Sequence, residues 1–154
     1  MVLEMTNFSE CMDELENALL EYSEVFPYDI PTVHRFLPGM YIREVTMPEG
    51  SIVTTMTHKT QHPFVVSKGV CDVADEKGNV RRIRAPYTGI TNPGTRRVLA
   101  ILEETVWTTF HMTDITDPDE WVAKNTFVQN KSITSTARLQ CFTTRKENRL
   151  CPVQ

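Results

Sequence analysis

The stretch "GSIVTTMTHKTQHPFVVSKG", from Gly50 to Gly69, places two histidines between two glycines. Its β-branched and apolar residues favour extended strands, and glycines mark points where strands turn or kink. Met56, His58 and His62 are separated by even numbers of residues, so on a regular strand their side chains point to one face. The stretch therefore predicts strand structure that gathers these three side chains.

Short runs of the same kind continue from about residue 36 to residue 113, divided by turns rich in Gly, Pro or Asn. The predicted strands cover 40–47, 51–60, 62–75, 80–86, 96–102 and 105–114, with "YTGITNPG" after the fourth and a charged turn at Glu103 and Glu104 before the last. Short strands with turns about every 8–12 residues are typical of an antiparallel sandwich or barrel. In the last strand Trp107 and Phe110 fall on opposite faces and each favours burial, so the pattern leaves open whether His111 points inward.

Residues 7–25 predict a helix that precedes the barrel. Asn7 is a suitable N-cap, and acidic residues crowd the first turns, where the helix dipole favours negative charge. Apolar residues recur on one stripe, so the helix is expected to lie against its own barrel or a neighbouring subunit. A second, short helix is predicted to begin at Pro118, with Asp117 as its N-cap. The chain divides into an acidic N-terminal helix and linker at 1–34, a β-barrel at 35–114, and a short helix with a basic extended tail at 115–154.

The formal net charge of −4 is unevenly spread along the chain. Residues 1–34 hold eight carboxylates and no Lys or Arg, whereas residues 131–154 hold five basic residues and one glutamate. The two ends are expected to attract each other, within one chain or between neighbouring subunits. The candidate interaction residues are the helix stripe and the basic tail: Phe8, Met12, Leu15, Leu19, Arg138, Arg145, Lys146 and Arg149.

Neither a membrane nor a nucleic acid is an expected partner. No apolar run approaches the roughly 18 residues of a membrane span. The tail has too few charges and aromatic residues to predict a nucleic-acid surface. The four cysteines are scattered without a Cys-x-x-Cys pair, which predicts free thiols in a reducing compartment.

The spacing Gly50-x5-Met56-x-His58-x3-His62-x6-Gly69 resembles the first motif of the cupin family, in which a His-x-His pair and a glutamate stand between two glycines. "NPGTRR", at 92–97, resembles the second motif, with an arginine in place of its last histidine. The segments "YIREVTMPEG", "RIRAPYTGITNPGTRRV" and "EETVWTTFH" also resemble small cupin-like proteins of bacteriophages. This resemblance covers about half of the chain and implies a mainly β fold, a cupin-like jelly roll or double-stranded β-helix.

By the same resemblance, Met56, His58, His62 and Arg97 stand at the family's four metal-ligand positions, where only His58 keeps the family's residue. Arginine cannot deprotonate to become a ligand, and its charge repels a divalent cation. The degenerate set implies a non-enzymatic structural or assembly protein without a cofactor, namely a bacteriophage virion component of head, neck or tail. Such a protein is expected to be a homo-oligomer that binds other virion proteins and is made in the host cytoplasm. If no phage encodes it, it is expected to be cytoplasmic.

A different site is the alternative. His58, His62 and His111 are candidate metal ligands, because three imidazoles suit zinc, iron or copper with an open coordination position. The resemblance then implies a metal-dependent cupin enzyme, such as a small-molecule dioxygenase or isomerase, or a cupin that binds a small ligand. In this alternative Arg97 is a clamp for an anionic ligand, and Met56 also lines the ligand site.

Overall fold

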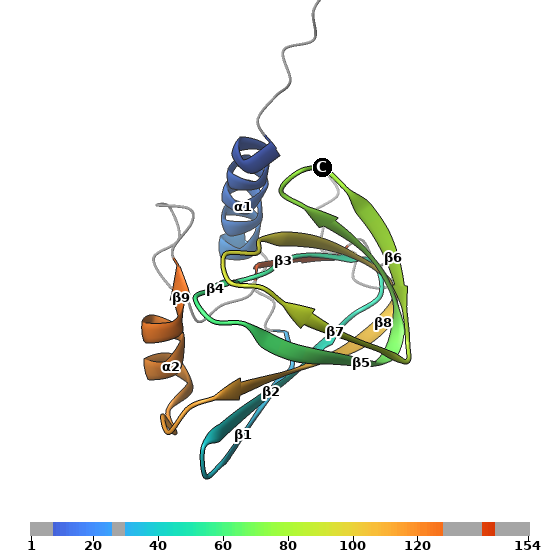
Figure 1. Cartoon of the computed structure of the whole chain (residues 1–154). Helices are drawn as coiled ribbons and strands as arrows, with labels where there is room; N and C mark the ends of the chain where they lie inside the picture. The colour runs from blue at the N-terminus through green and yellow to red at the C-terminus, as the bar shows by residue number, and fades with distance from the viewer. Residues whose placement is uncertain (1–7, 26–29, 128–139, 144–154) are drawn as a thin grey trace, which may run out of the picture.

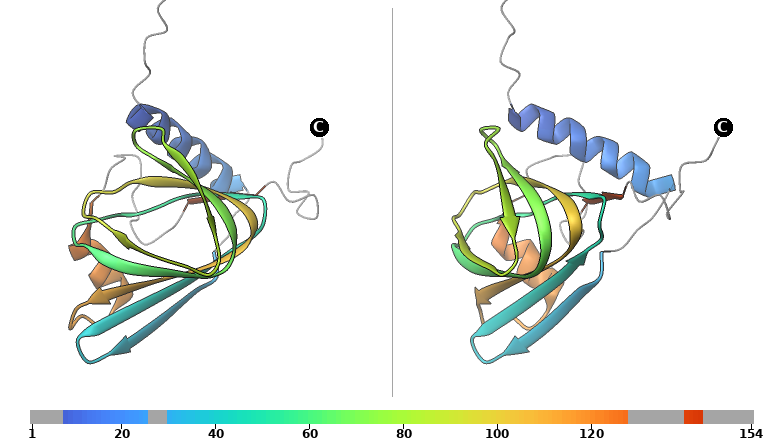
Figure 2. Two further views of the ribbon diagram at one scale, coloured as in Figure 1. Left: turned by 45° about the vertical axis from the view of Figure 1, so that its right-hand side comes forward. Right: turned by 90° about the vertical axis from the view of Figure 1, so that its right-hand side faces the viewer.

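The computed structural model describes residues 8–25, 30–127 and 140–143 of the 154-residue chain (Figure 1). The described residues form two helices and ten strands, and most strands belong to one antiparallel sheet that curls around a core (Figure 2). The helices are α1 (Phe8–Val25) and α2 (Pro118–Asn125). The strands are β1 (Thr32–Leu37), β2 (Met40–Met47), β3 (Ser51–Thr54), β4 (Thr57–His58), β5 (His62–Asp75), β6 (Val80–Arg84), β7 (Tyr87–Thr91), β8 (Arg97–Met112), β9 (Thr126–Phe127) and β10 (Gln140–Thr143).

Two long strands, β5 and β8, form the middle of the sheet and pair antiparallel over most of their length. On the far side of β5, β7 pairs with its first half and β6 with its second half. On the far side of β8, β2 pairs with its C-terminal half and β3 with its N-terminal half, and β1 and β10 extend these two edges. β4 and β9 form a separate short pair. The described residues therefore have the mainly β, cupin-like jelly-roll architecture that the sequence predicts, preceded by an N-terminal helix.

The core lies inside the curled sheet and follows the alternation of β2 and β8. On β2 every second residue, from Tyr41 to Met47, is buried, and this inward set includes Arg43. On β8 the buried residues are all odd-numbered, among them Leu99, Trp107 and His111. Apolar burial at about 25 cal/mol per Å² is the main stabilising contribution of such a core. The same alternation delivers polar side chains to the inside of the barrel.

The predicted turn at Glu103 and Glu104 is wrong, because β8 runs through both residues as one strand of 16 residues. The irregularity lies in its partner β5, whose register with β8 shifts between Val66 and Cys71. Gly69, within this segment, has a φ of 93°, and a Cβ there would lie 2.3 Å from the carbonyl oxygen of Glu104. Only glycine fits such a close approach, so a bulge in β5 provides the bend that the sequence pattern assigns to a turn.

Three further strand predictions differ from the structure. The predicted strand 51–60 is divided into β3 and β4 by residues 55 and 56. The sequence pattern does not predict β1, because this edge strand is mostly exposed and shows no alternation of buried positions. Nor does it predict β7, whose Gly89 suggests a turn. A Cβ at Gly89 would lie 2.6 Å from the Phe64 ring, so the glycine makes room for packing within the strand.

The short helix α2 begins as its capping signal predicts. The Asp117 side chain accepts a hydrogen bond of 2.8 Å from the backbone nitrogen of Glu120 and caps α2. On α1, Met12 and Leu19 are buried and Leu15 is half-buried, and the helix lies against β10 of the same chain. Asn7, the Phe8 side chain and the candidate tail residues Arg138, Arg145, Lys146 and Arg149 lie outside the described part. Neither described helix combines the length and apolar character that crossing a bilayer requires.

Candidate metal centre and ligand pocket

Three histidines from three different strands meet inside the barrel: His58 of β4, His62 of β5 and His111 of β8. The ring centroids are 4.4 Å apart for His58 and His62, 4.5 Å for His62 and His111, and 5.3 Å for His58 and His111. All three are buried, with exposed fractions of 8%, 3% and 3% in sequence order. The structure thus brings the three predicted ligands together, and it answers the open question about His111, which points inward.

The His111 ring is held by one nitrogen and leaves the other without a partner. The Thr109 hydroxyl donates a long hydrogen bond of 3.4 Å to the carbonyl oxygen of Arg43, so its oxygen accepts the bond of 2.9 Å from His111 Nε2. With the proton on Nε2, the lone pair of His111 is on Nδ1. Nδ1 is buried and has no hydrogen-bond partner in the described part of the chain. A buried nitrogen lone pair without a donor is the form in which imidazole binds a metal ion.

The His62 ring is oriented in a comparable way. Its Nδ1 lies 3.3 Å from the carbonyl oxygen of Thr60, and because a carbonyl can only accept, Nδ1 carries the proton. The lone pair of His62 is therefore on Nε2. A contact of this kind between the non-ligating nitrogen and a backbone carbonyl is common among metal-binding histidines.

The electrostatics of the cluster keep the imidazoles neutral. Burial lowers the pKa of His58 to about 3, with further contributions from His62, Arg43 and Arg97. Burial likewise lowers the pKa of His111 to about 2, assisted by the neighbouring histidines and Arg43. Burial also lowers the pKa of His62, against the opposing effect of its hydrogen bond to Thr60. At neutral pH, protons therefore do not compete with a metal ion for the three lone pairs.

The donor set fits a transition-metal ion after a small rearrangement. One nitrogen from each ring lies within 4.8 Å of those from the other two rings. Nitrogens bound to one ion at about 2.0–2.1 Å in tetrahedral geometry are about 3.4 Å apart. To bind one ion, the nitrogens would therefore have to move closer together by up to roughly an ångström. A neutral three-imidazole set suits zinc, copper, iron or nickel better than magnesium or calcium, which prefer oxygen ligands.

Aromatic side chains close one side of the histidine cluster. The Trp121 ring of α2 has its centroid 4.2 Å from that of His111 and 5.7 Å from that of His58. Tyr41 packs edge-on against Trp121 at 5.2 Å and lies 5.7 Å from His111. The short helix α2 thus covers the cluster with apolar surface, which lowers the local dielectric and strengthens electrostatic interactions there.

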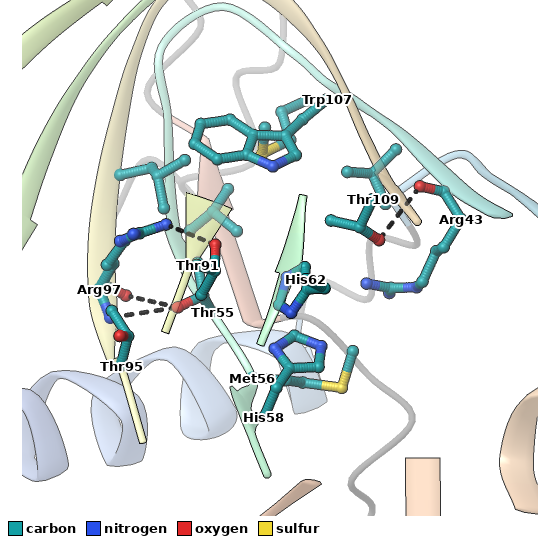
Figure 3. A pocket seen from close by; sticks show the side chains of 14 residues that line it. Arg43, Thr55, Met56, His58, His62, Thr91, Thr95, Arg97, Trp107 and Thr109 are labelled. Carbon is teal, nitrogen blue, oxygen red and sulfur yellow. Dashed lines mark hydrogen bonds between the residues drawn. The ribbon is translucent and has the colours of Figure 1, made fainter. Parts of the chain in front are cut away.

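A pocket adjoins the histidines and extends into the barrel (Figure 3). It holds about 570 Å³ of empty space, part of it open to solvent. Its lining combines two arginines, four threonines, five apolar side chains and two of the histidines, together with Met56. In sequence order these are Arg43, Val45, Met47, Val53, Thr55, Met56, His58, His62, Thr91, Thr95, Arg97, Leu99, Trp107 and Thr109.

Arg97 lines this pocket, as the alternative prediction requires. Its Nη1 donates a hydrogen bond of 3.2 Å to the Thr91 hydroxyl, and its guanidinium lies 5.7 Å from the centroid of the Phe64 ring. Its backbone nitrogen donates to the Thr55 hydroxyl at 3.1 Å. Burial lowers the pKa of Arg97, although a guanidinium does not deprotonate in proteins. Met56, the second residue predicted to bind a ligand, is half-buried in the pocket wall.

Two features of the site escape the sequence analysis. Arg43 is 8% exposed and points into the pocket from the wall opposite Arg97 (Figure 3). A signal for it exists, because Arg43 is in phase with the apolar residues Tyr41, Val45 and Met47 on β2. Trp121 is the other feature, and no local pattern connects it to the histidines, since α2 approaches them only in the folded chain.

No family model matches the chain, and no curated protein is similar to it in sequence. Solved structures are similar to it. A protein from Neisseria meningitidis shares 12% identity over 62% of this chain and 96% of its own, with a TM-score of 0.48. A cupin-2 domain protein from Shewanella frigidimarina shares 15% identity, and the match covers 61% of this chain and 91% of that protein, with a TM-score of 0.46. Salicylate 1,2-dioxygenase from Pseudoaminobacter salicylatoxidans shares 11% identity, and the match covers 66% of this chain and 31% of that protein, also with a TM-score of 0.46. At these identities nothing about activity follows from the likeness.

Proposed function

We propose that this chain is a metal-dependent cupin-like protein that binds a small molecule beside a transition-metal ion held by His58, His62 and His111. The metal would supply Lewis-acid polarisation of a bound oxygen or, if it is iron or copper, redox chemistry. In this proposal the three histidines hold the ion, and the side chains that line the adjoining pocket orient the ligand. Trp121 covers the histidines and limits the access of water to them.

One observation supports this proposal most directly: the buried Nδ1 of His111 has no partner among the described residues, while its Nε2 is fixed by Thr109. Leaving a buried polar atom unsatisfied costs about 1–3 kcal/mol, and a bound ion would remove this cost. A metal ion bound by the cluster would give Nδ1 the partner that it lacks among the described residues. The predicted repulsion from Arg97 remains, and an anionic ligand between the ion and the arginine would offset it.

Elemental analysis of protein purified without added metal tests the proposal. We expect stoichiometric zinc, iron or copper, and loss of that metal in the His58→Ala, His62→Ala and His111→Ala variants. The fourth histidine of the chain, His34, is exposed and lies outside the cluster, so His34→Ala is the matched control and should keep the metal. Protein that takes up no metal, even when each of these ions is added in excess, would contradict the proposal.

A second candidate is the oligomeric assembly protein of a virion that the sequence analysis favours. The charge asymmetry between the acidic N-terminal segment and the basic tail supports it. The apolar stripe of α1 supports it less, because Met12 and Leu19 are already covered within the chain. Deleting residues 144–154 tests this candidate, because it removes Arg145, Lys146 and Arg149 but keeps β10, which pairs with β3. An assembly role of the tail predicts loss of oligomers in light scattering with an intact barrel, whereas the metal-centre role alone predicts an unchanged oligomeric mass and unchanged metal content.

A further inference from the structure

The ligand pocket has two cationic side chains and, among the described residues that line it, no carboxylate. Arg43 and Arg97 form no ion pair with any described residue, unlike Arg96, which is adjacent in sequence to Arg97 and pairs with Asp13 and Glu16. Arg43 is buried and Arg97 is half-buried. A buried charge without a counter-ion is destabilising, so the pocket favours a ligand that brings negative charge.

The Arg97 guanidinium is positioned for such a ligand. The Thr91 hydroxyl and the Phe64 ring hold it from two sides, and Thr55 fixes its backbone. Only one of its five N–H donors has a side-chain partner among the described residues, which leaves paired donors for a planar acceptor. Figure 3 shows Arg97 and Arg43 on opposite sides of the pocket, with His58 and His62 between them.

The pocket also has apolar walls, which select against a bare inorganic anion. Its apolar walls come from Trp107 and the aliphatic side chains of Val45, Met47, Val53 and Leu99. The Trp107 ring is stacked on Phe64, with centroids 4.4 Å apart and planes inclined by 17°, and is therefore a rigid surface. A flat or branched hydrocarbon group would replace water against these walls, which is favourable in proportion to the apolar area covered.

We propose that the pocket takes a small organic carboxylate, with the carboxylate on Arg97 and an apolar body packed against Trp107. A carboxylate matches the guanidinium fork in two parallel hydrogen bonds, which a neutral alcohol or amide does not reproduce. The inference deepens the proposed function, but only its placement beside a metal ion rests on that function. Carboxylate binding by the arginines requires no metal.

Isothermal titration of the metal-free, full-length protein tests this inference, with benzoate, pentanoate, benzyl alcohol and inorganic phosphate as probes. We expect benzoate or pentanoate to bind, and benzyl alcohol to bind about tenfold more weakly or not at all. Arg97→Gln should weaken carboxylate binding by about tenfold or more, and Arg97→Lys should restore part of it because it keeps the charge. Arg84→Gln, an exposed arginine on β6, is the matched control and should leave binding unchanged.

Three results would overturn the inference: no binding of either carboxylate, equal affinity for benzyl alcohol, or unchanged affinity in folded Arg97→Gln protein. Phosphate binding in preference to both carboxylates would overturn the role of the apolar walls. Thermal melts establish that each variant is folded. Because the titration uses metal-free protein, its outcome is independent of whether the three histidines bind metal, which the elemental analysis decides.

Discussion

Arg96 and Glu16 form an ion pair of 2.8 Å in which both side chains are almost fully buried, at 1% and 4% exposure. Arg96 also lies 2.7 Å from Asp13, one turn earlier on α1. The pair connects the N-terminal helix to the residue that precedes β8. The acidic face of α1, which the sequence analysis connects with a basic tail or a neighbour, thus has a counter-ion on the barrel itself.

Replacing Arg96 by Met should destabilise the protein by about 3–5 kcal/mol, because it leaves the buried Glu16 carboxylate without its cation. Urea denaturation gives the change in the free energy of unfolding. The exposed pair Lys124 and Glu120 is the control, since Lys124→Met should change stability by less than about 0.5 kcal/mol. Equal effects of the two substitutions would show that the buried pair does not anchor α1.

Replacing Gly69 by Ala should destabilise the protein by more than the same change at Gly39. Both glycines have positive φ, a conformation that costs an L-residue about 1–2 kcal/mol. At Gly39 a Cβ meets nothing within 4 Å, whereas at Gly69 it meets the Glu104 carbonyl at 2.3 Å. The difference between the two variants in urea denaturation measures the clash in the β5 bulge. Equal stability of the two variants would contradict the prediction and show that the backbone of β5 shifts enough to remove the clash with Glu104.

The stability of the metal-free protein should fall as the pH is lowered below about 6.5. The pKa values of His58 and His111 are about 3 and about 2 in the folded protein, below the ordinary value of 6.5 that applies to the unfolded chain. Between these values the unfolded chain binds more protons, so each histidine lowers stability by about 1.4 kcal/mol per pH unit of acidification. Urea midpoints between about pH 7.5 and 5 give the slope. His58→Gln should make the slope shallower, and an unchanged slope would contradict the assignment.

Replacing Thr109 by Val should weaken metal binding without removing a ligand. The Thr109 hydroxyl accepts from His111 Nε2 and fixes the lone pair on Nδ1. Loss of such an outer contact typically lowers metal affinity by about 10–100-fold. Competition titration with a zinc chelator measures the affinity. Thr88→Val, an exposed position on β7, is the control, and equal affinities of the two variants would contradict the positioning role of Thr109.

Much of the fold can be predicted from the sequence, because the local sequence signals agree with the burial of side chains in the structure. β2 and β5 have the predicted bounds, and Asp117 and Pro118 mark the start of α2. The continuity of strand β8 cannot be predicted from the sequence, because the charged pair Glu103 and Glu104 resembles a turn when it is considered without its neighbours. The pairing of β8 with the bulged strand β5 joins residues that are 22 to 45 positions apart in sequence.

Only part of the candidate site can be predicted from the sequence, for a related reason. The shared face of His58 and His62 follows from strand geometry, but the inward direction of His111 depends on which of Trp107 and Phe110 is buried. The tertiary fold buries Trp107 and leaves Phe110 half-buried, which settles the direction. Arg43 was overlooked because an arginine on an inward strand position is uncommon, and local sequence does not reveal the pocket it faces.

β8 carries Arg97 at its start, Trp107 and Thr109 near its end and His111 beyond them, all on the inner face. Side chains alternate along a strand, so inserting a single amino acid after Val98 would reverse the face of every later position unless a new bulge absorbed it. One such insertion would turn an imidazole, an indole and a hydroxyl to the outside together. The inward direction of these side chains therefore depends on one strand register. Substitutions can change the chemistry of the pocket one residue at a time, whereas a change in the length of β8 would disrupt several of its residues together.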